Sequence, residues 1–323
     1  MWQTIGHAWA VAYLQRTLET GRIAHATLLT GPSEIGKTHL ALEYAAALQC
    51  RAGQEGPCGV CRDCVETLAG AHADLLMVEP DNGRIKIDQV RQVQHELALR
   101  PHNSRWRICL VTAFETTTTE AANALLKLLE EPPAHAVLLL TALDPGLLLP
   151  TIVSRCRVLP LRPVAAGEIA RALVERYQAD PVRAREIAQL SAGRVGWAIR
   201  ACQEPTLVEQ HDADVRMMLE LVPQGPAARL QAAEELAKRP DVRLAVFEWQ
   251  IAWRDIMLLA AGCQEQLIVN QKQLPALRQL AHKIGLGQAR IAASRAQEVI
   301  GQIAQNVNPR LALETMLLSW RHN

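Results

Sequence analysis

The chain has 323 residues, of which 49% are hydrophobic and 4% aromatic. A chain of this length is longer than a typical domain with a single hydrophobic core, so we predict two or three domains. Lys and Arg number 34 against 33 Asp and Glu, so the net charge of +1 excludes the large positive field that alone attracts a protein to nucleic acid. Since no charged leader with an apolar core opens the chain and no run of 18 apolar residues occurs, we expect neither secretion nor a membrane span, and we predict a cytoplasmic protein.

Five short β-type runs occur in the first half of the chain, and segments with helical spacing separate them. Their sequences and positions are ATLLT (26–30), DLLMVE (74–79), RICLVT (107–112), AVLLLT (136–141) and CRVLPL (156–161). Apolar strands that alternate with helices are typical of a parallel sheet that helices cover on both faces. We therefore predict an α/β parallel-sheet domain over residues 1–162.

Beyond residue 162 the β-type runs stop and helical segments follow one another. Proline and glycine interruptions predict a small helical domain over 163–205 and an all-helical C-terminal domain over 206–323. Within 246–262 the larger apolar residues share overlapping helical faces, so we expect them in the core of the last domain. These residues are Phe247, Trp249, Ile251, Trp253 and Ile256.

Residues 31–38 read GPSEIGKT, directly after the first strand run and before a segment with helical spacing, which predicts a P-loop. Its glycines allow the backbone N–H groups to point at phosphate oxygens, while Lys37 supplies a charge and Thr38 a hydroxyl for Mg²⁺. We therefore predict a site for ATP or ADP with Mg²⁺. The alternative is a loop that persists as a scaffold without nucleotide. The predicted cofactor-binding residues are Gly31, Pro32, Ser33, Glu34, Ile35, Gly36, Lys37 and Thr38.

Hydrolysis normally also requires an acidic residue at the end of a neighbouring strand, where it holds Mg²⁺ and helps to position water. The third strand run ends at Val111, Thr112 and Ala113, where an acidic pair would belong. Glu115 is the nearest carboxylate, but it lies two or three residues beyond the position of the acidic pair. A shift of this size at a strand end turns the side chain in another direction. The sequence therefore favours a P-loop without turnover.

Four of the eight cysteines lie close together in the sequence, at Cys50, Cys58, Cys61 and Cys64. The last three form two overlapping C-x-x-C steps, from which thiolates can reach one tetrahedral Zn²⁺ about 2.3 Å away. A redox motif would not need all four, and the spacing fits neither ferredoxin-type pattern. We therefore predict a structural zinc module at 50–64. The other four, predicted to be small buried side chains, are Cys109, Cys156, Cys202 and Cys263.

Three further stretches carry a family resemblance, namely HATLLTGPSEIGKT (25–38), AANALLKLLEEPP (121–133) with TIVSRCRVLPL (151–161) behind it, and NVNPRLALETMLL (306–318). Together with the four-cysteine insert, they resemble bacterial sliding-clamp loaders of the AAA+ class over essentially the whole chain. The resemblance implies a RecA-like P-loop domain with a zinc insert, a helical lid domain and a C-terminal collar domain. It also implies a hetero-pentameric ring with motor and wrench subunits, which loads the sliding clamp on primer-template DNA during replication.

Within that family the ATP-hydrolysing subunits carry an acidic pair after a strand and a sensor arginine in the lid, and this chain departs at both positions. Alignment on NALLK (123–127) places Thr112 and Ala113 at the acidic pair, and alignment on SAGRVGWAI (191–199) places Gly196 at the sensor. The chain therefore resembles the rigid, non-motor stator subunit, with little or no ATPase activity of its own. The runner-up is an active P-loop ATPase, either a motor-type subunit or a lone zinc-containing enzyme.

The resemblance also gives a role to the SRC segment at 154–156, because it implies that Arg155 projects into the ATP site of the next subunit as a catalytic arginine finger. Arg157 and Arg162 lie nearby in the sequence, so position alone does not select among the three arginines. For the helical segment 87–97, the resemblance implies that Arg91 approaches DNA phosphate. A solvated charge on an amphipathic helix is an equally good interpretation of Arg91.

Overall fold

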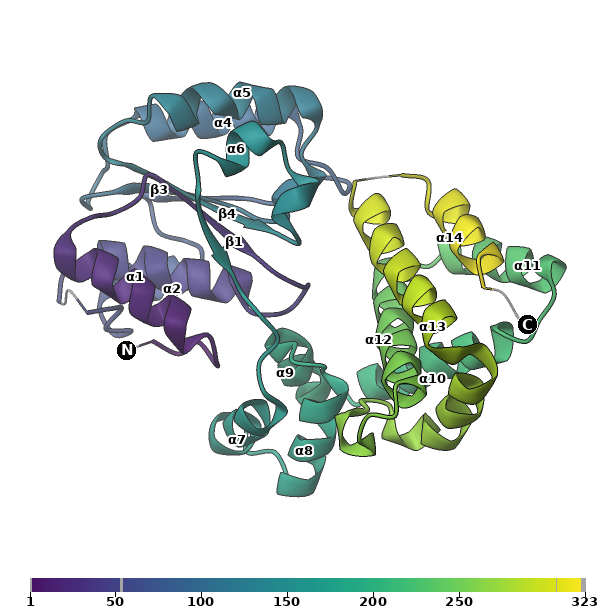
Figure 1. Cartoon of the computed structure of the whole chain (residues 1–323). Coiled ribbons are helices and arrows are strands. Elements are labelled where there is room, and N and C mark those ends of the chain that lie inside the picture. Colours follow the sequence, from purple (N-terminus) through teal and green to yellow (C-terminus); the bar gives the residue numbers. More distant parts are fainter. Residues whose placement is uncertain (1, 53–54, 306, 321–323) are drawn as a thin grey trace. The chain divides into compact units, whose positions relative to one another are not determined.

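The computed structural model describes residues 2–52, 55–305 and 307–320. The chain divides into two compact units, the first formed by Met1–Ala172 with Gly193–Trp197 and the second by Leu173–Ala192 with Ala198–Asn323 (Figure 1). The predicted division into domains at residues 162 and 205 stays a prediction. Within the described ranges, every helix is too short or too polar to cross a membrane.

The first unit contains a five-stranded sheet with the strand order β2-β3-β4-β1-β5, and every neighbouring pair is parallel. The strands are β1 (Ala26–Thr30), β2 (Leu75–Val78), β3 (Arg107–Val111), β4 (Ala136–Ala142) and β5 (Arg157–Pro160). All five agree with the strand runs of the sequence. The predicted α/β parallel-sheet fold is therefore confirmed.

Helices cover both faces of this sheet, with α4, α5 and α6 on one face and α1 and α2 on the other (Figure 1). Successive strand residues alternate between these layers, so that Leu28 packs with α4 and α5 whereas Leu29 packs with α1 and α2. Such two-sided burial explains why the strands read as continuous apolar runs. The helices of this unit up to residue 153 are α1 (Ala8–Thr20), α2 (Lys37–Gln49), α3 (Arg62–Leu68), α4 (Ile87–Ala98), α5 (Thr119–Glu130) and α6 (Pro150–Val153).

Helices make up the rest of the described chain. Local capping explains several of their starts, because the Asp180 carboxylate accepts the N–H groups of Val182 and Arg183 at the start of α8, and Asn308 accepts that of Arg310 at α14. Gly285, at φ 73°, kinks α13. The helices are α7 (Ala166–Tyr177), α8 (Pro181–Leu190), α9 (Val195–Gln203), α10 (Thr206–Leu221), α11 (Pro226–Ala237), α12 (Val242–Ala260), α13 (Leu274–Ala304) and α14 (Pro309–Leu318).

Helix α12 supplies the core of the second unit and packs against α10 and α13. Trp249 and Trp253 are almost fully buried, and each meets the ring of Trp320 edge to face, at centroid distances of 5.6 and 5.4 Å. Ile251 and Ile256 are buried as well, while Phe247 is half-buried. The core predicted for this region is therefore confirmed for four residues and holds partly for Phe247.

Candidate functional site

The predicted P-loop lies between the end of β1 and the start of α2, at the carboxyl edge of the sheet. Gly31 adopts φ 144°, and a Cβ atom there would lie 2.5 Å from the carbonyl oxygen of Leu161, so only glycine fits. The Nζ of Lys37 donates to the carbonyl oxygens of Gly31 and Pro32 at 2.6 and 2.7 Å. The two carbonyls of the loop therefore hold the ammonium group of Lys37 in place.

Two elements outside the loop hold its apex. The N–H of Gly196, the second residue of α9, donates to the carbonyl of Glu34 at 2.7 Å. The Nε2 of His7 lies 3.0 Å from the carbonyl oxygen of Ile35, and burial lowers the pKa of His7. The neutral ring therefore carries its proton on Nε2 and donates it to Ile35. Sequence reasoning missed His7, because nothing in the local pattern connects it to the loop.

The end of β3, which β4 separates from β1 and the P-loop, carries Thr112 and Ala113 in place of an acidic pair. Thr112 continues the direction of β3 and donates its N–H to Val78, whereas Ala113 adopts a left-handed conformation with φ 48°. The N–H of Ala113 donates to the Oγ1 of Thr141, a buried residue near the end of β4, at 3.1 Å. Neither Thr112 nor Ala113 offers a carboxylate to Mg²⁺, and the absence of turnover stays a prediction.

Glu115, the nearest carboxylate, turns toward the end of β4. Its Oε2 accepts the N–H of Leu143 at 3.3 Å, and the carbonyl of Leu143 accepts the N–H of Gly31 at 3.1 Å. The left-handed turn at Ala113 thus lets Glu115 reach the segment that supports the first P-loop glycine. This contact identifies Glu115 as a support of the loop from the neighbouring strand end.

The four cysteines predicted to bind zinc converge on one point. The sulfur atoms of Cys50, Cys58, Cys61 and Cys64 all lie within 4.8 Å of one another. A tetrahedral shell with bonds of about 2.3 Å separates its sulfurs by about 3.8 Å, and Cys58 and Cys64 lie 3.9 Å apart. The arrangement therefore fits one metal ion with four sulfur ligands. Residues 53 and 54 of the predicted module lie outside the described residues.

Helix geometry explains how the sulfurs meet. Cys50 directly follows α2, and Cys61 caps α3 by accepting the N–H of Cys64 at 3.4 Å. The Cys58 sulfur accepts the N–H of Cys61 in the same way at 3.3 Å. The backbone N–H groups of Val60 and Cys61 lower the pKa of Cys58 to about 6, whereas burial raises the pKa of Cys64 to about 12. A metal ion would have to displace the Cys64 proton, since thiolates are the ligands of Zn²⁺.

The remaining cysteines are less uniform than expected. Cys109 is fully buried in β3, and burial raises its pKa well above the usual range of thiols. Cys156, Cys202 and Cys263 are only half-buried. The interpretation as small buried side chains therefore holds for Cys109 alone.

Arg155, the predicted finger, lies in the turn between α6 and β5. Its side chain is 35% exposed and pairs with Glu130, the last residue of α5, at 2.8 Å. Arg157 is engaged elsewhere, since its guanidinium lies 4.8 Å from the ring centre of Tyr13. Arg91 is exposed on α4 and pairs with Asp88 at 3.4 Å. A DNA contact of Arg91 stays a prediction.

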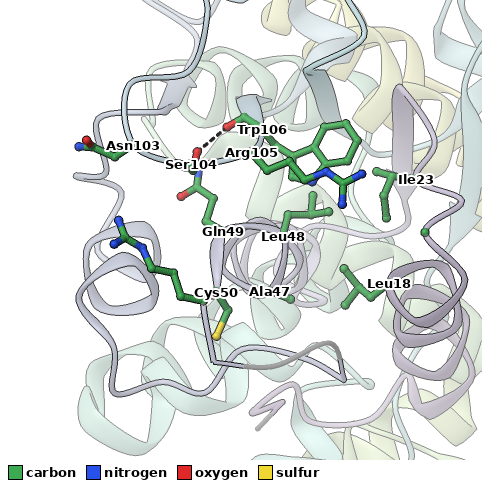
Figure 2. A pocket seen from close by; sticks show the side chains of 12 residues that line it. Leu18, Ile23, Ala47, Leu48, Gln49, Cys50, Asn103, Ser104, Arg105 and Trp106 are labelled. Atoms are coloured by element: carbon green, nitrogen blue, oxygen red, sulfur yellow. Dashed lines mark hydrogen bonds between the residues drawn. The ribbon is translucent and has the colours of Figure 1, made fainter.

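A pocket of about 520 Å³ lies at the opposite edge of the sheet, between the ends of α1 and α2 and the loop before β3 (Figure 2). Its lining combines the apolar side chains of Leu18, Ile23 and Trp106 with polar ones such as Asn103. Cys50 contributes to the wall, so the pocket adjoins the cysteine cluster. The pocket shares no residue with the P-loop and is therefore separate from the candidate nucleotide site.

Comparison with known proteins identifies the family. Residues 6–165 match the family described as DNA polymerase III, delta subunit, and residues 219–322 match its C-terminal family. A DNA polymerase III subunit delta' from Pseudomonas aeruginosa is 32% identical over 338 aligned positions, which cover 97% of each chain. The chain belongs to the DNA polymerase III delta' family.

Other delta' and related proteins match in part. The delta' subunit of Bacillus subtilis is 35% identical over 178 residues, which are 55% of this chain and 54% of that protein. The gamma/tau subunit of Mycobacterium tuberculosis H37Rv is 36% identical over 176 residues, 54% of this chain but 30% of that protein. Among solved structures, the RuvB Holliday junction branch migration motor of Thermotoga maritima is 16% identical, with 95% and 87% coverage and a TM-score of 0.46.

Proposed function

We propose that this chain is the non-motor stator subunit of a bacterial sliding-clamp loader. In this role it joins motor and wrench subunits in a hetero-pentameric ring, and the complex places the sliding clamp on primer-template DNA. The similarity to a delta' subunit along 97% of both chains supports this function, because the gamma/tau match covers only about half of this chain. The net charge of +1 agrees with DNA contacts that are shared among subunits.

The stator role is supported by one local observation: the P-loop keeps every signature residue, whereas Thr112 and Ala113 replace the acidic pair that hydrolysis requires. We infer that the loop binds ATP or ADP with Mg²⁺ and that this chain does not turn it over. Lys37 would contact the phosphates, and the hydroxyl of Thr38 would contact the metal ion. The alternative of an active motor-type subunit is not supported, because Thr112 and Ala113 provide no acidic pair at the end of β3.

The four-cysteine cluster binds one structural Zn²⁺ in this proposal. Its sulfur separations suit a tetrahedral ion, and four thiolates leave no coordination position open for chemistry. The ion would connect the end of α2 to the start of α3. It supports the fold of the insert and takes no part in ATP hydrolysis.

Arg155 acts, in the same proposal, in the ATP site of a neighbouring subunit. A guanidinium from an adjacent protein stabilises the charge that spreads over the transferred phosphoryl group. Its partial exposure on a turn suits this role, since a side chain on the surface can reach a neighbour. In well-measured phosphoryl-transfer enzymes such a finger contributes a factor of about 10³–10⁵ in rate.

Reconstituted clamp-loader complexes test the proposal. Complexes with Arg155→Ala should assemble normally, lose part of the total ATPase rate and lose more of the clamp-loading rate, because one site among several is affected. Arg155→Lys should restore little, since a flexible point charge does not reproduce the planar guanidinium. ATPase and clamp-loading rates equal to those of the wild type, with assembly confirmed, would exclude the finger role.

A further inference from the structure

Three acceptors surround the side chain of Arg155. Its Nη1 donates to the carbonyl of Thr151 at 2.9 Å and lies 3.4 Å from the Oγ of Ser154, while its Nη2 lies 2.8 Å from the Oε1 of Glu130. Thr151 lies in α6 and Ser154 directly follows it, so both are close to Arg155 in the sequence, whereas Glu130 comes from a different helix, α5. Glu130 is therefore the contact that ties the arginine to the body of the sheet domain.

The surroundings of Glu130 favour a cation at this position. Glu130 ends α5, and the helix dipole places partial negative charge at this end. Thr151 lies in the short helix α6, and its carbonyl accepts from Nη1, the other terminal nitrogen of the guanidinium. The guanidinium is thus held between α5 and α6 by acceptors that come from both.

We infer that Glu130 is a positioning residue for Arg155, an inference that rests on the proposed finger role. An arginine side chain loses much rotamer freedom when it binds a phosphoryl group. Because Glu130 already restricts that freedom, less remains to be lost when the neighbouring ATP site forms. At 51% exposure the carboxylate stays hydrated and the ion pair is weak. The pair engages Nη2, so other N–H groups of the guanidinium can bind phosphate while Glu130 keeps the side chain in place.

The size of the effect follows from the exposure of the pair. Exposed ion pairs have small coupling energies, so loss of Glu130 should lower the rate that depends on Arg155 by about 1.5- to 5-fold. The loss should appear in kcat with KM unchanged, because the finger acts in the transition state and not in ground-state binding. A merely structural role of Glu130 would instead lower assembly or thermal stability.

Glu130→Ala, Glu130→Gln and the control Glu131→Ala in reconstituted complexes provide the test. Glu131 is the adjacent exposed carboxylate, and among the described residues it forms no ion pair. We expect kcat to fall in the order wild type, Glu130→Gln, Glu130→Ala, because glutamine keeps the acceptor but not the charge. Glu131→Ala should match the wild type.

A variant that combines Arg155→Ala with Glu130→Ala completes a double-mutant cycle. This double variant should be no slower than Arg155→Ala alone. If Arg155→Ala is impaired while Glu130→Ala equals or exceeds the wild type, the positioning role is overturned and the finger role stands. Additive effects of the two substitutions would overturn the positioning role in the same way. If Arg155→Ala itself equals the wild type, the proposed finger fails and the positioning role fails with it.

Discussion

The backbone N–H of Gly196 donates to the carbonyl of Glu34 at 2.7 Å, so the first turn of α9 rests directly on the P-loop. A Cβ atom at Gly196 would lie 2.9 Å from that same carbonyl oxygen. Glycine is therefore required at this point by a backbone atom that cannot move aside. Gly196 lies at the position where the family resemblance implies a sensor arginine. In this chain, the glycine at that position allows α9 to contact the loop closely.

Gly196→Ala should destabilise the first unit and weaken nucleotide binding. The added methyl group meets backbone, and overpacking of this kind costs about 1–3 kcal/mol, more than the gain of up to about 1 kcal/mol in helix propensity. Gly167→Ala is a matched control, because Gly167 is likewise the second residue of its helix, α7, and has open space at its Cβ. Thermal unfolding should show a lower Tm for Gly196→Ala only; equal Tm values would contradict the close-contact argument.

His7 should make the stability of the protein depend on pH. Burial lowers its folded-state pKa, and the hydrogen bond to Ile35 and the charge of Glu168 oppose this shift only in part. The folded state therefore favours the neutral ring. The contribution of His7 to the free energy of unfolding is fully present above the unfolded pKa of 6.5. It is lost as the pH falls below that value, because the unfolded chain then binds a proton at this ring more readily than the folded chain does.

His7→Asn removes this titration and suits the left-handed backbone of residue 7, at φ 55°. Between pH 8 and pH 5, the Tm of the wild type should decrease more steeply than that of His7→Asn. His25→Asn serves as the control for the substitution itself, because the ring of His25 is exposed. Parallel curves for the wild type and His7→Asn would show that His7 does not titrate differently in the folded state.

Metal analysis of freshly purified protein should find one zinc per chain, and Cys61→Ser should lower this content. Structural zinc in small peptides contributes about 10–16 kcal/mol of apparent binding free energy, but here the sheet has its own core. Chelation should therefore accelerate proteolysis near residues 50–64 without unfolding the unit. Cys109→Ser should leave the metal content unchanged, since Cys109 lies in β3. Iron in place of zinc, or no metal, would refute the assignment.

Glu115 should support nucleotide binding as a hydrogen-bond acceptor and not as a metal ligand. Glu115→Ala removes the acceptor of the Leu143 N–H, so nucleotide affinity should fall about fivefold, as expected for one hydrogen bond. Glu115→Gln keeps an acceptor and should stay within about twofold of the wild type. The affinity measured with and without Mg²⁺ separates the two roles. A loss of Mg²⁺ dependence in Glu115→Gln would identify the carboxylate as a ligand of the ion.

The sheet and the cysteine cluster are predictable from the sequence, because both depend on local patterns. Each strand is an apolar run that both faces of the sheet bury, and three of the four sulfurs come from one short stretch. Lys37 and its glycines are likewise recognisable from spacing alone. These features need no knowledge of which distant segments meet.

The contacts that shape the site are not predictable in this way, since they join segments far apart in the chain. His7 reaches Ile35, Gly196 reaches Glu34, and Glu115 reaches Leu143 through the turn at Ala113. Backbone groups form at least one side of each of these contacts, and a backbone group is not specific to a residue type, so no residue pattern indicates which segments pair. The sequence shows that Glu115 lies out of phase with the strand, but the direction of its side chain depends on the left-handed Ala113.

The steady-state ATPase rate of the isolated chain, compared with that of Lys37→Ala, tests the central claim most directly. A complete phosphate cradle beside strand ends without an acidic pair should bind adenine nucleotide and hydrolyse it negligibly. Lys37→Ala should weaken binding by about tenfold or more, as the loss of a charge-assisted contact would, and its turnover should equal that of the wild type. Robust turnover by the wild type that disappears in Lys37→Ala would contradict the claim and identify the chain as a motor-type ATPase.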